Sequence, residues 1–154
     1  MKITEQALKV MKSDVIGKDV LETACGRADL SVAMSPLART VECIDLVDFR
    51  LNPEVEKCAN VRFSVMDATR TAFADGSFDT VVVFNAAYHI KDELSAVIAE
   101  CTRVTRQGGA IYVISSVSID RAVIDGDIVT LLNGIGAQFT VERDKTFISV
   151  KIAV

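Results

Sequence analysis

Short apolar runs recur along the chain, and they constrain its fold more than any other feature. Five of these runs have the length and composition of short β-strands, namely residues 20–21, 41–46, 61–66, 80–84 and 110–114. Several show no alternation of polar and apolar residues, which is typical of strands that are covered on both faces of a sheet. Helix-like stretches alternate with these strands, so the pattern predicts a parallel sheet flanked by helices.

Two apolar stripes at helical spacing accompany the strands, and both are expected to face the core. The first consists of Leu94, Val97, Ile98, Cys101 and Val104, and the second of Ile128, Leu131, Leu132 and Ile135. Gly108 and Gly109 are expected to end the first helix. Residues 138–154 read as two strands around a polar turn at residues 143–145, which predicts that the sheet ends in an antiparallel hairpin.

Length and composition exclude several classes of protein. With 154 residues, half of them hydrophobic, residues 1–154 are expected to form one domain with its own core. The net charge of -4 gives no broad positive field, which disfavours nucleic acid as a partner. The four cysteines are scattered without metal-ligand spacing, so we predict reduced thiols and no metal site. Because no apolar run is long enough to cross a bilayer or to act as a signal peptide, we expect a cytoplasmic protein that does not bind membranes.

The segment from residue 19 to residue 31, DVLETACGRADLS, reads as a strand, a turn of small residues and the start of a helix. Ala24, Gly26 and Ala28 alternate with other residues in this turn and keep bulky side chains out of the way. A ligand can therefore come close to the main chain here. A tight turn that binds no ligand is the alternative interpretation.

This turn does not match two familiar nucleotide-binding motifs. Ala24, Gly26 and Asp29 occupy the three glycine positions of G-x-G-x-x-G, and an acid at the third position disfavours a nicotinamide-dependent oxidoreductase. A P-loop is excluded because no GK[ST] sequence follows a glycine-rich turn.

Polar side chains also follow the later strands. Asp45 lies 19 residues after Gly26, close to the spacing of about 20 residues at which an acid accepts hydrogen bonds from ribose hydroxyls. Asp67 closes the third strand, and residues 85–89 form the loop after the fourth.

The whole succession resembles the class I S-adenosylmethionine-dependent methyltransferases, especially the group that includes the ubiquinone and menaquinone biosynthesis enzymes (methyltransferase type 11 domain). The matching segments are ETACGRA for the glycine-rich turn, CIDL for the ribose acid, MDA for the adenine acid, SFDTVVVFNAAYHI for the fourth strand and ECTRVTRQGGAIYVISS for the fifth. This resemblance covers residues 15–116. It implies an α/β fold with a Rossmann-like, doubly wound, mostly parallel seven-stranded sheet in three α/β/α layers, ending in the antiparallel hairpin.

The resemblance also implies S-adenosylmethionine as cofactor, with S-adenosylhomocysteine as product, and assigns residues to its methionine end. Glu22 and the backbone of Ala24, Cys25 and Gly26 would hold that end. Ala24 and Ala28 replace the first and third glycines of the family turn, and alanine at the third position is the departure that bears most on close approach of the cofactor.

The remaining cofactor contacts are implied at the ends of the next three strands. Asp45, with Leu46 beside it, would bind the ribose hydroxyls. Asp67 would bind the adenine amino group, with the Ala68 backbone beside the ring. Asn85 and its neighbouring carbonyls would face the sulfonium.

His89 and Tyr88 are the candidates for the acceptor side. A methyl sulfonium is already activated, so the protein mainly has to align a nucleophile with it. A base helps if the acceptor must lose a proton, and His89 is the only histidine. The alternatives are a hydrogen-bonded loop residue for His89 and a packing role for Tyr88. The loop reads NAAY, unlike the N/D-P-P-Y/F motif of enzymes that methylate nucleic-acid bases, which favours a small-molecule acceptor.

Two further expectations concern partners and activity. We expect an open acceptor site, because few residues precede the first strand and no insertion follows the fifth. A homodimer or a partner protein could complete such a site. The principal alternative to an enzyme is a non-catalytic module that binds the cofactor or a partner through a degenerate methyltransferase fold.

Overall fold

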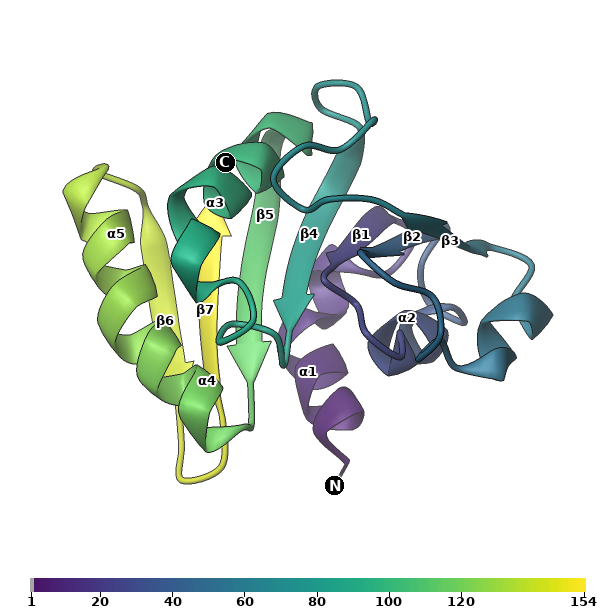
Figure 1. The fold of residues 1–154 in the computed structure, drawn as a ribbon, viewed down its shortest axis with the longest axis horizontal. Coiled ribbons are helices and arrows are strands. Elements are labelled where there is room, and N and C mark those ends of the chain that lie inside the picture. Colours follow the sequence, from purple (N-terminus) through teal and green to yellow (C-terminus); the bar gives the residue numbers. More distant parts are fainter. Residues whose placement is uncertain (1) are drawn as a thin grey trace.

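The computed structural model describes residues 2–154 and contains a seven-stranded sheet in the order β3-β2-β1-β4-β5-β7-β6 (Figure 1). The strands are β1 (Asp19–Thr23), β2 (Thr40–Asp45), β3 (Val61–Val65), β4 (Phe78–Phe84), β5 (Thr105–Ser115), β6 (Phe139–Arg143) and β7 (Ile148–Ala153). The first five run parallel to one another, and β7 runs antiparallel to both β5 and β6. The mostly parallel sheet and its terminal hairpin are therefore confirmed.

Helices cover both faces of this sheet, as Figure 1 shows. They are α1 (Ile3–Met11), α2 (Asp29–Met34), α3 (Leu94–Val104), α4 (Ser118–Val123), a π-helical turn (Ile124–Ile128) and α5 (Val129–Gly134). Short 3₁₀ segments occur at Lys12–Asp14, Pro53–Lys57 and Lys91–Glu93. Buried side chains of α1 and α2 pack on one face, and those of α3, α4 and α5 pack on the other.

Alternate residues of the central strands enter the two halves of the core. Val81 and Val83 of β4 belong to the cluster beneath α3, whereas Val82 between them belongs to the cluster beneath α1. All three are fully buried. Because successive side chains of a strand point to opposite faces, burial on both faces requires an uninterrupted apolar run.

Two expectations about the helices were wrong. Helix α3 ends at Val104 rather than at the glycines, because β5 begins at Thr105 and pairs there with Phe78. Gly109 lies inside that strand, where a Cβ atom would stand 2.4 Å from the main-chain oxygen of Asp79. The second error concerns Ile135, which is 61% exposed because α5 ends one residue before it.

The order of the strands reverses next to β1. The chain moves outward from β1 to β2 and β3, and then returns to place β4 on the other side of β1. In open α/β sheets, ligands bind at such a reversal, beyond the carboxyl ends of the strands.

A spanning helix needs about 20 predominantly apolar residues. Within residues 2–154, no helix combines the length and hydropathy required to cross a membrane.

Candidate active site

A cavity of about 500 Å³ lies beyond the carboxyl ends of β1, β2, β3 and β4. Its wall includes all nine residues that the sequence resemblance assigned to the cofactor: Glu22, Ala24, Cys25, Gly26, Asp45, Leu46, Asp67, Ala68 and Asn85. His89 also lines this cavity. Its volume falls in the usual range for small-molecule and cofactor sites.

The turn after β1 has an unusual backbone. Ala24, Gly26 and Ala28 all adopt positive φ angles, of 53°, 55° and 62°. This left-handed region suits glycine and costs alanine about 1 kcal/mol or more at each position. No heavy atom lies within 4 Å of the position that a Cβ atom would take on Gly26, so the main chain there is open to close approach from the cavity.

Glu22 is a buried carboxyl group on β1 with a polar partner on α2. One of its oxygens accepts hydrogen bonds from the Ser31 main-chain N–H at 3.0 Å and from the Ser31 hydroxyl at 2.6 Å. No hydrogen bond within residues 2–154 engages the other oxygen. Removal from water raises the pKa of Glu22 to about 8, since the hydrogen bonds from Ser31 oppose this shift only in part.

Asp45, at the end of β2, reaches across to the turn after β1. Its Oδ2 accepts a hydrogen bond from the Gly26 N–H at 2.8 Å, and its Oδ1 lies 3.4 Å from the Val47 N–H. The contact with Gly26 fixes both the carboxylate and the turn in one arrangement. Leu46, which is 68% exposed, continues the wall beside Asp45.

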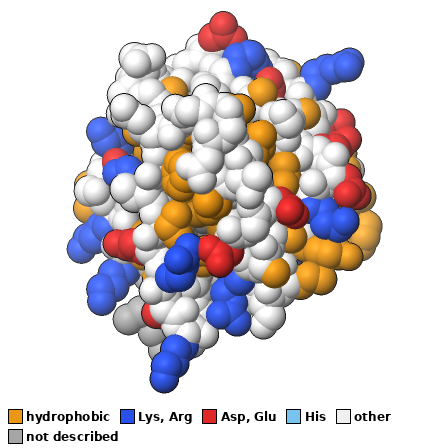
Figure 2. All heavy atoms as spheres, turned by 90° about the vertical axis from the view of Figure 1, so that its left-hand side faces the viewer, with side chains coloured by type: hydrophobic (Ala, Val, Ile, Leu, Met, Phe, Trp, Pro, Cys, Tyr) orange, Lys and Arg blue, Asp and Glu red, His pale blue; other side chains and the backbone are white. Residues whose placement is uncertain are grey.

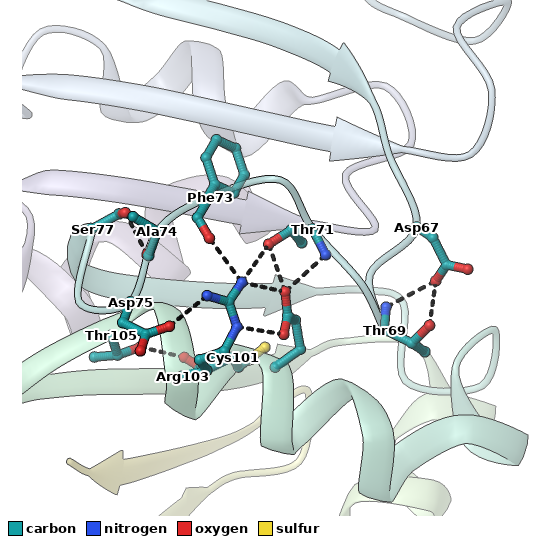
Figure 3. A network of polar contacts seen from close by, with 11 residues as sticks. Asp67, Thr69, Thr71, Phe73, Ala74, Asp75, Ser77, Cys101, Arg103 and Thr105 are labelled. Atoms are coloured by element: carbon teal, nitrogen blue, oxygen red, sulfur yellow. Dashed lines mark hydrogen bonds and ion pairs between the residues drawn. The ribbon is translucent and has the colours of Figure 1, made fainter.

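Asp67 stabilises the turn that follows β3 (Figure 3). Its Oδ1 accepts hydrogen bonds from the Thr69 N–H at 2.8 Å and from the Thr69 hydroxyl at 2.7 Å. These bonds lower the pKa of Asp67, so the group is ionised at neutral pH. Its second oxygen has no hydrogen-bond partner in the described part of the chain, and Ala68 lies beside it on the cavity wall.

Asn85 and His89 lie in the loop after β4. Asn85 has a positive φ of 50°, and its side-chain oxygen accepts hydrogen bonds from the Ser115 hydroxyl at 2.9 Å and the Ser116 N–H at 3.0 Å. The amide is therefore anchored to the end of β5 while it lines the cavity. The His89 side chain is exposed on the same wall.

Tyr88 does not belong to the cavity lining within residues 2–154. Its side chain is 42% exposed, and the Lys91 ammonium lies 5.3 Å from the centre of its ring. The rings of Tyr88 and His89 meet edge to face with 6.5 Å between their centres.

A buried carboxylate that sequence reasoning missed supports this loop. Asp120 of α4 is 2% exposed and accepts a hydrogen bond from the Tyr88 N–H at 2.8 Å. Its other oxygen lies 2.8 Å from the Ser115 hydroxyl, which also contacts Asn85. No local motif marks Asp120, because its partners lie 5 and 32 residues earlier in the chain.

The cavity wall also contains residues that the sequence did not assign to the site. They are Arg27, Asp29, Val47, Arg50, Met66, Phe84, Ala86, Ile90, Glu93 and Val97. Most of them are close neighbours of predicted residues in the same loops. Glu93 comes instead from the end of the 3₁₀ segment before α3, and Val97 from α3 itself, where the apolar stripe indicated only a role in the core.

Two of the cysteines meet at the edge of the site. Cys25 and Cys43 belong to one small buried cluster beneath the turn after β1. Contact with Cys43, together with burial, raises the pKa of the Cys25 thiol above its ordinary value. A protonated thiol is a poor nucleophile, so the Cys25 side chain is a small packing residue beneath the turn.

Comparison with known proteins identifies the family. A model of the methyltransferase domain family matches residues 20–109, which is more than half of the chain. The ubiquinone biosynthesis O-methyltransferase of Thiobacillus denitrificans is 31% identical over 106 residues, covering 66% of this chain and 45% of that protein. The chain thus spans less than half the length of this curated relative.

Solved structures show the same fold. A SAM-dependent methyltransferase from Aquifex aeolicus superposes with a TM-score of 0.77 at 18% identity, covering 94% of this chain and 87% of that one. The structure of DhpI in complex with SAH superposes with a TM-score of 0.77 at 19% identity, covering 97% and 85%. The fold and the family match agree, and the chain belongs to the methyltransferase domain family.

Proposed function

We propose that this protein transfers the methyl group of S-adenosylmethionine to a small-molecule acceptor by in-line displacement. The observation that carries the proposal is that all nine predicted cofactor residues and the only histidine line the same cavity. These residues come from the ends of four different strands, so their meeting in one wall depends on the fold and not on nearness in sequence.

The hydrogen-bond acceptors in the cavity suit this cofactor. In the proposal, Glu22 and the turn at Gly26 hold the methionine end, Asp45 binds the ribose hydroxyls, and Asp67 binds the adenine amino group. Glu22 and Asp67 each use one oxygen for a bond within the protein and keep the other available. Carboxylate oxygens accept hydrogen bonds from amino and hydroxyl groups, which matches the donors on the cofactor.

The raised pKa of Glu22 predicts that a proton is released when the cofactor binds. An ammonium group beside Glu22 would favour its ionised form, because an opposite charge lowers the pKa of a carboxyl group. With a pKa of about 8 in the protein alone, Glu22 would then release a proton when the cofactor binds at neutral pH. Calorimetry in buffers of different ionisation enthalpy measures this release directly.

Chemistry at the methyl group requires little from the protein beyond alignment. The bound cofactor supplies an activated methyl group. His89 would accept a proton from the acceptor, since an imidazole can take up a proton near neutral pH. Asn85 would line the wall near the sulfonium, and Tyr88 would pack at the outer side of His89. The net charge of -4 favours a small molecule over nucleic acid as the acceptor.

Titration calorimetry with S-adenosylmethionine and S-adenosylhomocysteine tests the cofactor site. We expect micromolar binding to the wild type and at least about tenfold weaker binding to Asp45→Ala and Asp67→Ala, because each loses a charged hydrogen-bond acceptor. Asp48→Ala is the matched control, since Asp48 is exposed, lies three residues from Asp45 and is not part of the cavity wall. A folded wild type that binds neither compound would rule out the proposed function.

Turnover separates the enzyme from the non-catalytic module, which the comparisons do not favour. The assay follows labelled methyl transfer from S-adenosylmethionine to a panel of phenols, thiols and amines. His89→Ala is expected to slow transfer at least about 100-fold while S-adenosylhomocysteine binds as before, if His89 is the base. Tight cofactor binding without transfer to any class of acceptor would support the module instead.

A further inference from the structure

The segment between β3 and β4 has almost no regular structure, yet it carries the proposed adenine contacts. From Met66 to Ser77, its only regular element is one isolated bridge between Asp67 and Arg70. This bridge closes a tight turn, with the Arg70 N–H donating to the Asp67 main-chain oxygen at 3.1 Å. The hydrogen bonds from Thr69 to the Asp67 side chain complete the turn. Residues 67–70 therefore form one small hydrogen-bonded unit.

Helix α3 holds the residues after this unit through Glu100 and Arg103, which lie one turn apart. Figure 3 shows Arg103 with its partners Thr71, Phe73 and Asp75. Glu100 accepts hydrogen bonds from the Thr71 N–H at 2.7 Å and from the Thr71 hydroxyl at 2.6 Å. Thr71 is the residue directly after the turn, so its position fixes one end of residues 67–70.

Arg103 holds the next part of the same segment. Its guanidinium donates to the Phe73 main-chain oxygen at 2.8 Å and to Asp75 at 2.7 Å. Its main-chain oxygen accepts a hydrogen bond from the Gly76 N–H at 3.0 Å. The Phe73 ring then packs edge to face on Phe78 of β4, with 4.9 Å between ring centres.

The two helix residues also hold each other. The Arg103 Nε and Nη2 atoms donate to the two oxygens of Glu100 at 2.8 and 2.7 Å. The Glu100 side chain is only 12% exposed and that of Arg103 35%, so solvent screens this pair less than a surface pair. A two-point guanidinium–carboxylate contact of this kind fixes geometry as well as charge.

The same helix reaches the cavity directly. Val97 of α3 lies one turn before Glu100 and is part of the cavity wall. Helix α3 thus lines the site at Val97. Its next turn, with Glu100 and Arg103, holds the segment that carries Asp67.

We propose that Glu100 and Arg103 are positioning residues for the adenine end of the cofactor, acting through Thr71 on Asp67 and Ala68. This inference rests on the proposed function, because it assumes that Asp67 and Ala68 contact the adenine. Neither Glu100 nor Arg103 lines the cavity within the described residues, so neither would act by direct contact with the cofactor.

The test measures S-adenosylhomocysteine binding by calorimetry for the wild type, Glu100→Gln and Arg103→Gln. Each variant is expected to bind about tenfold more weakly, an effect of the size seen between directly coupled groups. Arg39→Gln is the matched control, because Arg39 also pairs with a carboxylate that is 11% exposed, that of Asp19, and neither residue lies in the cavity wall. The control breaks an ion pair outside the cavity and should keep its affinity.

A double-mutant cycle with Asp67→Asn distinguishes positioning from general loosening. If Arg103 acts through Asp67, Arg103→Gln should weaken binding by less than about threefold once Asp67 is replaced. Equal losses in both backgrounds would overturn the proposal, as would unchanged affinity in Arg103→Gln. Should Arg103→Gln fail to fold, Thr71→Ala removes one hydroxyl only and must still weaken binding several-fold. A wild type that does not bind S-adenosylhomocysteine at all would refute the proposed function itself, a distinct result.

Discussion

The Asp120 carboxylate accepts a hydrogen bond of 2.8 Å from the Tyr88 main-chain N–H and thereby ties the loop after β4 to α4. Asp120 is 2% exposed, and its second oxygen faces Ser115. Replacing Asp120 with alanine would leave the partly buried Tyr88 N–H without this partner, at a cost of about 1–3 kcal/mol.

Urea unfolding should therefore show a clear loss of stability for Asp120→Ala. Asp125→Ala provides the comparison, because Asp125 pairs with Arg143 at the surface and both side chains are 57% exposed. Such a pair contributes at most about 1 kcal/mol. Similar losses in the two variants would mean that the contact with Tyr88 contributes little.

The contribution of Glu22 to the stability of the protein should decrease as the pH rises. Its pKa is raised to about 8 in the folded protein, so the native state binds a proton that the unfolded chain releases at lower pH. The contribution of Glu22 is then complete below the unfolded pKa of about 4.3 and is lost as the pH rises toward about 8. Relative to Glu22→Gln, the wild type should lose up to about 1.4 kcal/mol per pH unit in this window. A constant difference between the two proteins would contradict the raised pKa.

The contribution of Glu100 to stability should decrease as the pH falls, which is the opposite of the dependence expected for Glu22. Its pKa is lowered to about 2, mainly by Arg103, so its contribution is present above the unfolded pKa and is lost as the pH falls toward about 2. Acid titration of unfolding should show that Glu100→Gln is less sensitive than the wild type at low pH. If both proteins lose stability in parallel, the ion pair with Arg103 does not persist in solution.

Gly109→Ala tests the close contact between β5 and β4. A Cβ atom at this position would lie 2.4 Å from the Asp79 oxygen and 2.8 Å from the Thr105 methyl group. The strands would have to move apart, which should cost about 1–3 kcal/mol. Gly134→Ala is the control, because nothing lies within 4 Å of a Cβ atom there. Thermal unfolding of both variants gives the comparison.

Much of the fold could be predicted from the sequence, because strands buried on both faces need apolar runs. The run at residues 80–84 lies within β4, and the run at residues 61–66 matches β3 to within one residue. The start of β5 was missed because Gly108 and Gly109 also fit a helix end. Only the contact of Gly109 with the neighbouring strand explains its place in β5.

Part of the candidate site could also be predicted from the sequence, and part could not. The nine residues predicted to hold the cofactor could be named because each belongs to a local motif, and the fold brings them to one cavity. Asp120 and Arg103 could not be assigned to the site, since their roles depend on segments about 30 residues away in the chain. Tyr88 follows a recognised motif, but it lies outside the cavity wall formed by residues 2–154.

His89 makes this site unusually easy to observe. The chain contains one histidine and no tryptophan, so intrinsic tryptophan fluorescence cannot report on ligands. The single imidazole, however, is exposed on the cavity wall. Its ring protons should give one isolated pair of proton NMR signals, whose shifts during a titration would report occupancy of the cavity in the unlabelled, unmodified protein.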